Sequence, residues 1–187
     1  MESMNDTIET AALRIVLKSQ YHAGLAMVRE AIERCPDELW LSRTPRNAFW
    51  QVAYHTLFYT HLYMLSGVSA FRPWKEHQSS VQNPDGIPGD PQPGSTLPLV
   101  PEPYTRQQAL AYWDICDQMV DGAVDALDLH DPHCGFPWYH MSKLEHQLVN
   151  LRHLQHHAAQ LADRLRAALD IGVQWVGAGR RPSTSSP

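Results

Sequence analysis

The chain has 187 residues, of which 43% are apolar and 19% charged, a composition typical of one globular domain and not of a disordered polypeptide. Fifteen basic and twenty acidic side chains give a net charge of −5, so the basic surface of most nucleic-acid-binding proteins is missing. The mean hydropathy is −0.38, and polar residues interrupt even the most apolar stretch, 49–65. We therefore expect neither nucleic acid nor a membrane among its partners.

The cysteines and the first residues of the chain indicate in which cellular compartment the protein is expected. The three cysteines, Cys35, Cys116 and Cys134, are far apart and odd in number, so they do not form a disulfide framework. The first residues lack the basic flank and apolar run of a secretory signal. We expect a cytoplasmic protein with a single domain over 1–176 and a flexible polar tail over 177–187.

Two segments in the first third of the chain predict amphipathic helices, because their apolar residues recur every three or four positions. The first covers 7–34, with an inward face formed by Ile8, Ala12, Ile15, His22, Leu25, Val28 and Ile32. The second covers 45–66. Thr44 is its expected N-cap, Pro45 its first residue, and Gly67 its left-handed C-terminal cap.

Two further helices are predicted over 105–129 and 142–171. Each opens with a capping box, Thr105 to Gln108 and Ser142 to Glu145, and the last is expected to stop at Gly172.

The segment 71–103 separates the second and third helices. It holds eight of the fourteen prolines, which excludes a regular helix there. A connection of this length is either a functional lid or crossover, or a loop packed loosely on the surface. Four amphipathic helices bury their apolar faces against one another as a bundle. The sequence thus predicts an all-α four-helix bundle with a long proline-rich crossover between its second and third helices.

Eleven histidines are spread through the chain, and two of them share a helical face. His153 and His157 are four residues apart, so they lie one turn apart and can bind one metal ion. A pair at this spacing arises readily by chance in a histidine-rich chain, and ordinary hydrogen bonds are the alternative. The same face carries further polar residues, His146, Asn150, Gln160 and Arg164. Buried polar groups need partners, and a metal ion would satisfy both imidazoles.

His55 offers a third ligand from the second helix. It lies ten residues past Pro45, roughly 15 Å into the helix, and His153 lies a similar distance past Ser142. The two depths match if the helices are parallel, and both lie near the middle of the bundle if they are antiparallel.

The motif His153-x-x-His156-His157-x-x-Gln160 on the last long helix, with an isolated His55 in the second, resembles the DinB-like superfamily of metal-binding four-helix bundles. The resemblance covers about 7–172. It implies that His55, His153 and His157 hold a divalent ion such as zinc or nickel. It also implies kinship with transferases, isomerases and hydrolases that use low-molecular-weight thiols. The chain departs from the family at 158–159, where two alanines replace Arg-Gly, and in the length of 71–103.

Three neutral nitrogen ligands leave zinc an open position, as in catalytic sites. The ion keeps its double charge and can lower the pKa of a bound water or thiol. We therefore expect a metal-dependent transferase or hydrolase with a small-molecule substrate, in which a low-molecular-weight thiol takes part. The alternative is a non-catalytic metal-binding or stress-response module with a structural metal, and a third possibility is a bundle whose histidines bind nothing. The sequence does not decide whether the protein is an enzyme.

The remaining histidines have less specific patterns. His146 and His156 are weak candidates for a catalytic base, although positions beside the ligands or on the surface explain them as well. His22 is expected to be a hydrogen-bonded core residue, and His61 an exposed or interface residue. The pair His133-Cys134 lies in a loop without an identifiable partner.

The aromatic content of the second helix suggests association. Six large rings in one helix exceed what one inward face can bury, which together with the family resemblance predicts a homodimer. These rings are Phe49, Trp50, Tyr54, Phe58, Tyr59 and Tyr63.

Overall fold

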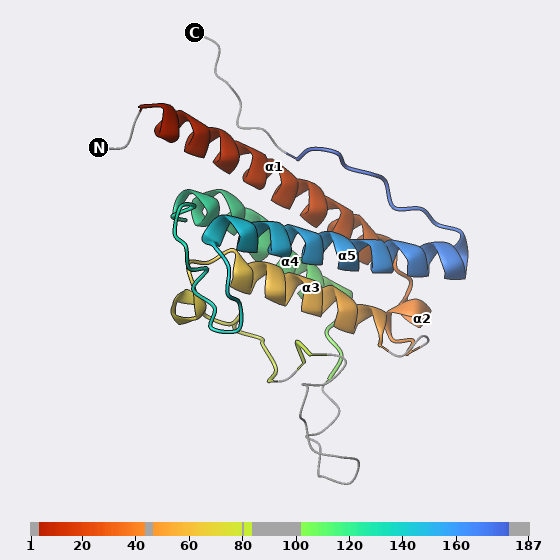
Figure 1. The fold of residues 1–187 in the computed structure, drawn as a ribbon. Helices are drawn as coiled ribbons and strands as arrows, with labels where there is room; N and C mark the ends of the chain where they lie inside the picture. The colour runs from red at the N-terminus through yellow and green to blue at the C-terminus, as the bar shows by residue number, and fades with distance from the viewer. Residues whose placement is uncertain (1–3, 44–46, 80, 84–101, 180–187) are drawn as a thin grey trace.

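The computed structural model describes residues 4–43, 47–79, 81–83 and 102–179, with side chains from residue 8 onward. Its helices, shown in Figure 1, are α1 (Met4–Arg34), α2 (Asp37–Trp40), α3 (Phe49–Tyr63), the 3-10 turn η1 (Val68–Ala70), α4 (Arg106–Asp125) and α5 (Lys143–Leu169). No strand occurs in the described residues. The predicted all-α class is confirmed.

The four long helices form a bundle in which α1 and α3 each pack against both α4 and α5. Figure 1 shows α1 and α5 running in one direction and α3 and α4 in the other. The start of α4 therefore lies near the start of α3, where the Trp40 indole donates to the Tyr104 carbonyl over 2.7 Å. The end of α3 and the start of α4 lie at opposite ends of the bundle (Figure 1), and residues 80 and 84–101 of the connection between them lie outside the described residues.

The predicted boundaries of the second helix are wrong at both ends. Helix α3 begins at Phe49 instead of 45, and the Gln51 side chain accepts a hydrogen bond from the Ala48 amide over 2.9 Å. Thr44 and Pro45 lie outside the described residues. At the other end Gly67 is extended, with φ 171°, and not left-handed. A close approach of the chain explains this glycine, since a Cβ there would lie 2.8 Å from the Gly135 carbonyl oxygen.

The starts of α4 and α5 are confirmed by their caps. The Thr105 hydroxyl accepts from the Gln108 amide over 3.2 Å, and the Gln108 side chain accepts from the Thr105 amide over 2.9 Å. The Ser142 hydroxyl accepts from the Glu145 amide over 3.3 Å. Both helices end earlier than predicted, α4 at Asp125 and α5 at Leu169, where Asp170 takes the left-handed conformation with φ 54°.

The inward face of α1 is correct only in its second half. Leu25, Val28 and Ile32 are fully buried, whereas Ile8 and Ile15 are 62% and 49% exposed. Steps of one helical turn back from Leu25 lead to Tyr21, Leu17 and Thr10, which are buried. They do not lead to positions 8 and 15. The inward face predicted from the apolar spacing therefore combined residues from two different faces of α1.

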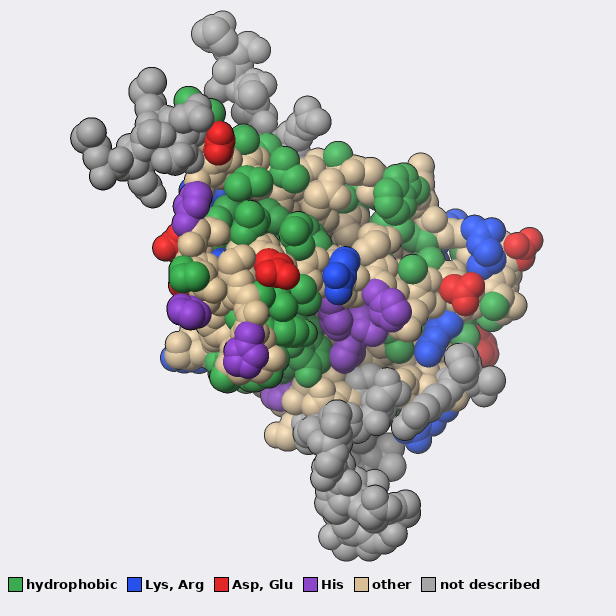
Figure 2. All heavy atoms as spheres, viewed as in Figure 1, with side chains coloured by type: hydrophobic (Ala, Val, Ile, Leu, Met, Phe, Trp, Pro, Cys, Tyr) green, Lys and Arg blue, Asp and Glu red, His purple; other side chains and the backbone are tan. Residues whose placement is uncertain are grey.

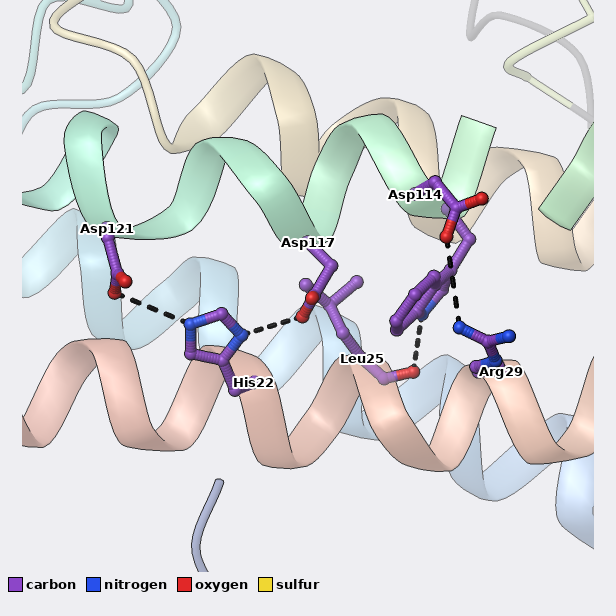
Figure 3. Close-up of polar contacts among 7 residues, drawn as sticks. His22, Leu25, Arg29, Asp114, Asp117 and Asp121 are labelled. Carbon is purple, nitrogen blue, oxygen red and sulfur yellow. Dashed lines mark hydrogen bonds and ion pairs between the residues drawn. The ribbon is translucent and has the colours of Figure 1, made fainter. Parts of the chain in front are cut away.

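Polar contacts join α1 to the acidic edge of α4 (Figure 3). The two ring nitrogens of His22 lie 2.6 Å from an Asp117 oxygen and 3.4 Å from an Asp121 oxygen. One turn further, the Trp113 indole donates to the Leu25 carbonyl over 2.7 Å. His22 is thus hydrogen-bonded in the α1–α4 contact, as predicted, but it is half-buried and not part of the core.

Residues 171–179 follow α5 and return along α1 (Figure 1). The Gly179 amide donates to the Ser19 carbonyl over 3.0 Å, and the Gln20 side chain donates to the Gly177 carbonyl over 3.2 Å. The first three residues of the predicted tail therefore lie against α1, and 180–187 lie outside the described residues.

Hydrogen bonds of Lys143 join the segment between α4 and α5 to the residues that follow α3. Lys143 is only 2% exposed, and its ammonium donates to the Ser66 carbonyl over 2.6 Å and to the Cys134 carbonyl. Burial lowers the pKa of Lys143. Gly135 has φ 85°, and a Cβ there would lie 2.1 Å from the Ser66 oxygen and 2.9 Å from the Cα of Gly67.

Substitution of Gly135 tests this contact. The change Gly135→Ala imposes a side chain on left-handed backbone and pushes it into backbone atoms, so we expect the free energy of unfolding to fall by more than about 2 kcal/mol. The control Gly122→Ala lies inside α4 with open space around it and should raise that free energy by up to about 1 kcal/mol. Urea unfolding measures both, and equal stabilities for the two variants would contradict the packing described here.

Candidate metal centre

Helices α3 and α5 bring His55, His153 and His157 together, the three residues predicted to bind metal. The Nε2 atom of His153 lies 3.0 Å from Nε2 of His55 and 3.1 Å from Nε2 of His157. One ring nitrogen from each histidine lies within 4.8 Å of the other two, and all three residues are half-buried. Figure 2 shows histidine side chains gathered on this face of the molecule, with hydrophobic side chains directly beside them.

The outer ring nitrogens of two of these histidines determine where their protons lie. His55 Nδ1 is 2.6 Å from the carbonyl oxygen of Gln82, and His157 Nδ1 is 2.8 Å from Oε1 of Gln160. A carbonyl oxygen only accepts, so each Nδ1 carries the proton and each Nε2 has a lone pair, which faces Nε2 of His153. This is the arrangement in which a histidine binds metal through Nε2.

His153 lies between the other two histidines. Its Nδ1 is buried without a partner among the described residues. Burial, reinforced by the neighbouring His157, His55 and His156, lowers the pKa of His153 to about 3. The ring is therefore neutral at pH 7, the state that a metal ligand requires.

The three histidines fit a divalent ion. In a tetrahedral zinc site with bonds of 2.0–2.1 Å, neighbouring nitrogens are about 3.3 Å apart. The two shortest nitrogen separations here, 3.0 and 3.1 Å, need only a small widening to reach that value. Among the described residues, no fourth histidine, cysteine or carboxylate joins this group. Of the four positions of a tetrahedral ion, these three histidines would occupy three.

Buried polar residues on α5 set its position against α3 and α1. The Gln147 amide donates to the Tyr63 carbonyl over 3.0 Å, and the Asn150 amide donates to the Thr60 carbonyl over 3.2 Å. The Tyr21 hydroxyl, from α1, donates to Gln147 over 2.7 Å and accepts from Asn150 over 3.0 Å. These contacts place His153 and His157, the next turns of α5, opposite His55.

Tyr59 and Asn83 also border the cluster, and sequence reasoning did not assign them to it. The Tyr59 ring centroid lies 4.8 Å from that of His55 and 5.5 Å from that of His153. Its hydroxyl donates to Asn83 Oδ1 over 2.7 Å. Tyr59 is one turn after His55, a spacing that could have identified it, whereas Asn83 reaches the site only through the folding of a loop.

The candidate base His146 lies in the core. It is fully buried between Phe136, stacked at 4.7 Å, and Tyr63, edge-on at 4.8 Å. Neither ring nitrogen has a partner among the described residues. Burial, with a smaller effect of Lys143, lowers the pKa of His146 to about 4. The other candidate, His156, is exposed, and its Nε2 lies 3.1 Å from the Gln160 amide nitrogen.

The prediction of an exposed His61 is wrong. Its side chain is 9% exposed and lies 3.1 Å from the Tyr112 hydroxyl of α4, and burial lowers the pKa of His61 to about 4. Helix α3 is buried on nearly every face, because α4, α5 and residues of the connection to α4 enclose it. The rings that suggested a homodimer pack within the single chain, for example Tyr54 on Tyr104 at 4.6 Å. The homodimer stays a prediction from the resemblance alone.

Comparison with known proteins identifies the family. The model of the DinB superfamily matches residues 20–161, which include all of α3 and α4 and the three clustered histidines. The chain belongs to the DinB superfamily. Searches of the curated proteins and of the solved structures gave no significant match. In the described part of the chain, no helix is both long and apolar enough to cross a membrane.

The burial of His146 predicts how the free energy of unfolding depends on pH. Its pKa is lower in the folded protein, about 4, than in the unfolded chain, so stability is lost as the pH falls from about 6.5 towards 4. The change His146→Phe keeps the ring stacking and removes the titrating group. We expect it to raise the free energy of unfolding by about 1–2 kcal/mol more at pH 5 than at pH 7.5. Urea unfolding at the two pH values measures this, and an equal effect at both would contradict it.

Proposed function

We propose that this DinB-superfamily protein is a metal-dependent enzyme in which His55, His153 and His157 hold one divalent ion, zinc or nickel. The observation that carries the proposal is the convergence of three Nε2 atoms, two of them with lone pairs directed by the hydrogen bonds of Gln82 and Gln160. Three neutral ligands and an open position are typical of catalytic zinc sites, whereas structural sites are closed by a fourth protein ligand.

A bound divalent ion supplies an electrostatic lowering of the pKa of a thiol or water at its open position. The chain contributes the surroundings. The Tyr59 ring covers one side of His55 and His153, and its hydroxyl is held by Asn83. The neighbouring contacts come from neutral groups, so the ion's charge is not offset by a carboxylate among the described ligand contacts.

Thiol transfer suits this site better than hydrolysis. A thiol has a pKa near 8.5 and loses its proton outright on a metal, without help from a base. Hydrolysis benefits from a positioned general base, and His146 is enclosed in the core. We therefore propose a thiol-dependent transferase that acts on a small molecule in the cytoplasm.

Metal content tests the site directly. Protein purified without added metal, or loaded with one equivalent of zinc, should retain one divalent ion per chain by elemental analysis. Each of His55→Ala, His153→Ala and His157→Ala should lose most of it, because two imidazoles bind far more weakly than three. The control His140→Ala changes an exposed histidine outside the cluster and should retain the full equivalent. Retention of tight metal by His55→Ala would contradict the assignment.

Thiol binding separates the enzyme from the structural module. In the cobalt-substituted protein, a low-molecular-weight thiol at the open position should produce a sulfur-to-cobalt absorption band in the ultraviolet and shift the visible spectrum. A site closed by protein ligands would show no change at any thiol concentration, and the structural alternative would then replace the enzymatic one. An alcohol of the same carbon skeleton is the matched control and should leave the ultraviolet spectrum unchanged.

A further inference from the structure

Two polar side chains of α5 lie beside the ligand His157, and the proposed function gives one of them, His156, no role. Gln160 and His156 are both exposed residues of α5, in the turns that carry His157. We infer that Gln160, held by His156, is a positioning residue that fixes the proton of His157 on Nδ1 and so sets the affinity of the site for its metal. The inference rests on the proposed function, since it concerns the same ion.

The three side chains form a directional chain of hydrogen bonds. Gln160 Oε1 lies 2.8 Å from His157 Nδ1, and Gln160 Nε2 lies 3.1 Å from His156 Nε2. Residues three and four apart on a helix are neighbours, so α5 itself holds the glutamine between the two histidines. No other element has to move to form or keep this chain.

The two ends of the amide have opposite consequences for the metal ligand. With its oxygen towards His157, the amide accepts the Nδ1 proton and leaves the Nε2 lone pair for the ion. With its nitrogen towards His157, the amide would donate to Nδ1, and the ring proton would move to Nε2, where it prevents binding. The structure has the first orientation, in which the amide nitrogen lies 3.1 Å from Nε2 of His156, and His156 supports it when that Nε2 accepts.

His55 provides an internal comparison. Its Nδ1 is bound by a main-chain carbonyl, Gln82 O, which cannot present a donor in place of its oxygen. The protons of His55 are therefore fixed by the backbone, whereas those of His157 depend on a side chain that can be substituted. A substitution at position 160 can therefore change the proton position of His157 without replacing a metal ligand.

Zinc affinity of point variants tests the inference, measured by competition with a chromophoric chelator. We expect Gln160→Leu to weaken zinc binding about 10–100-fold, the usual effect of losing the partner of a ligand's second nitrogen. Gln160→Glu, whose carboxylate also accepts from Nδ1, should bind within a few-fold of the unchanged protein or tighter. His156→Ala should weaken binding by a smaller factor. The Gln160 oxygen can still accept from His157 Nδ1, but the amide nitrogen loses its contact with His156.

Two controls separate positioning from other effects. Gln155→Leu removes a glutamine whose amide nitrogen lies 3.9 Å from the Met27 sulfur, and it should not change zinc affinity. Ala159→Glu adds a negative charge at an exposed neighbouring position without reaching Nδ1, so it should not reproduce the behaviour of Gln160→Glu. Circular dichroism checks that every variant keeps its helices.

A proton spectrum of the zinc-loaded protein gives a second readout. The Nδ1 proton of His157 should be visible downfield in the unchanged protein and in Gln160→Glu, and lost to solvent exchange in Gln160→Leu. Equal zinc affinity of Gln160→Leu and the unchanged protein would overturn the inference and leave the proposed function standing. Failure of the unchanged protein to bind zinc or nickel would overturn both.

Discussion

The register of α5 depends on one layer of buried hydrogen bonds, formed by Tyr21, Gln147 and Asn150. All three side chains are fully buried, and they bind each other and two carbonyls in the last turn of α3, those of Thr60 and Tyr63. Leaving such a group unpaired costs about 1–3 kcal/mol, so a shift of α5 by one residue would leave several unsatisfied. An apolar layer would permit such slippage, because aliphatic side chains interdigitate in more than one register. The polar layer thus determines which residues of α5 come next to α3.

The position of the histidine cluster follows from that register. His153 and His157 occupy the two turns after Asn150, and His55 lies just over one turn before Thr60, whose carbonyl binds Asn150. The cluster is therefore an extension of the polar layer from the interior towards the surface. In the interior, the side-chain amides of Gln147 and Asn150 donate to main-chain carbonyls of α3. At the half-buried end, three ring nitrogens meet, and His153 keeps a buried Nδ1 without a partner among the described residues.

The four long helices, and the pairing of His153 with His157, could be predicted because they depend on short-range spacing and capping. The match of His55 to the pair could be predicted from the family resemblance, whereas its depth was counted from Pro45 and α3 begins only at Phe49. Which faces of α1 and α3 are buried could not be predicted. Position 15 looks like a continuation of 25, 28 and 32, but the helix turns it outward, and His61 is buried because α3 is enclosed on nearly all sides. Gln82 and Asn83 reach the site through a loop, and no local pattern marks such residues.

The central claim is that α3 and α5 together bind one metal ion through three imidazoles. X-ray absorption by the zinc-loaded protein tests it most directly, because the fine structure reports both the number and the type of ligands. The account predicts three imidazole nitrogens at about 2.0–2.1 Å, with one further light atom, replaced by sulfur when a low-molecular-weight thiol is added. A spectrum with two or fewer imidazoles, or one that is unchanged in His55→Ala, would contradict it.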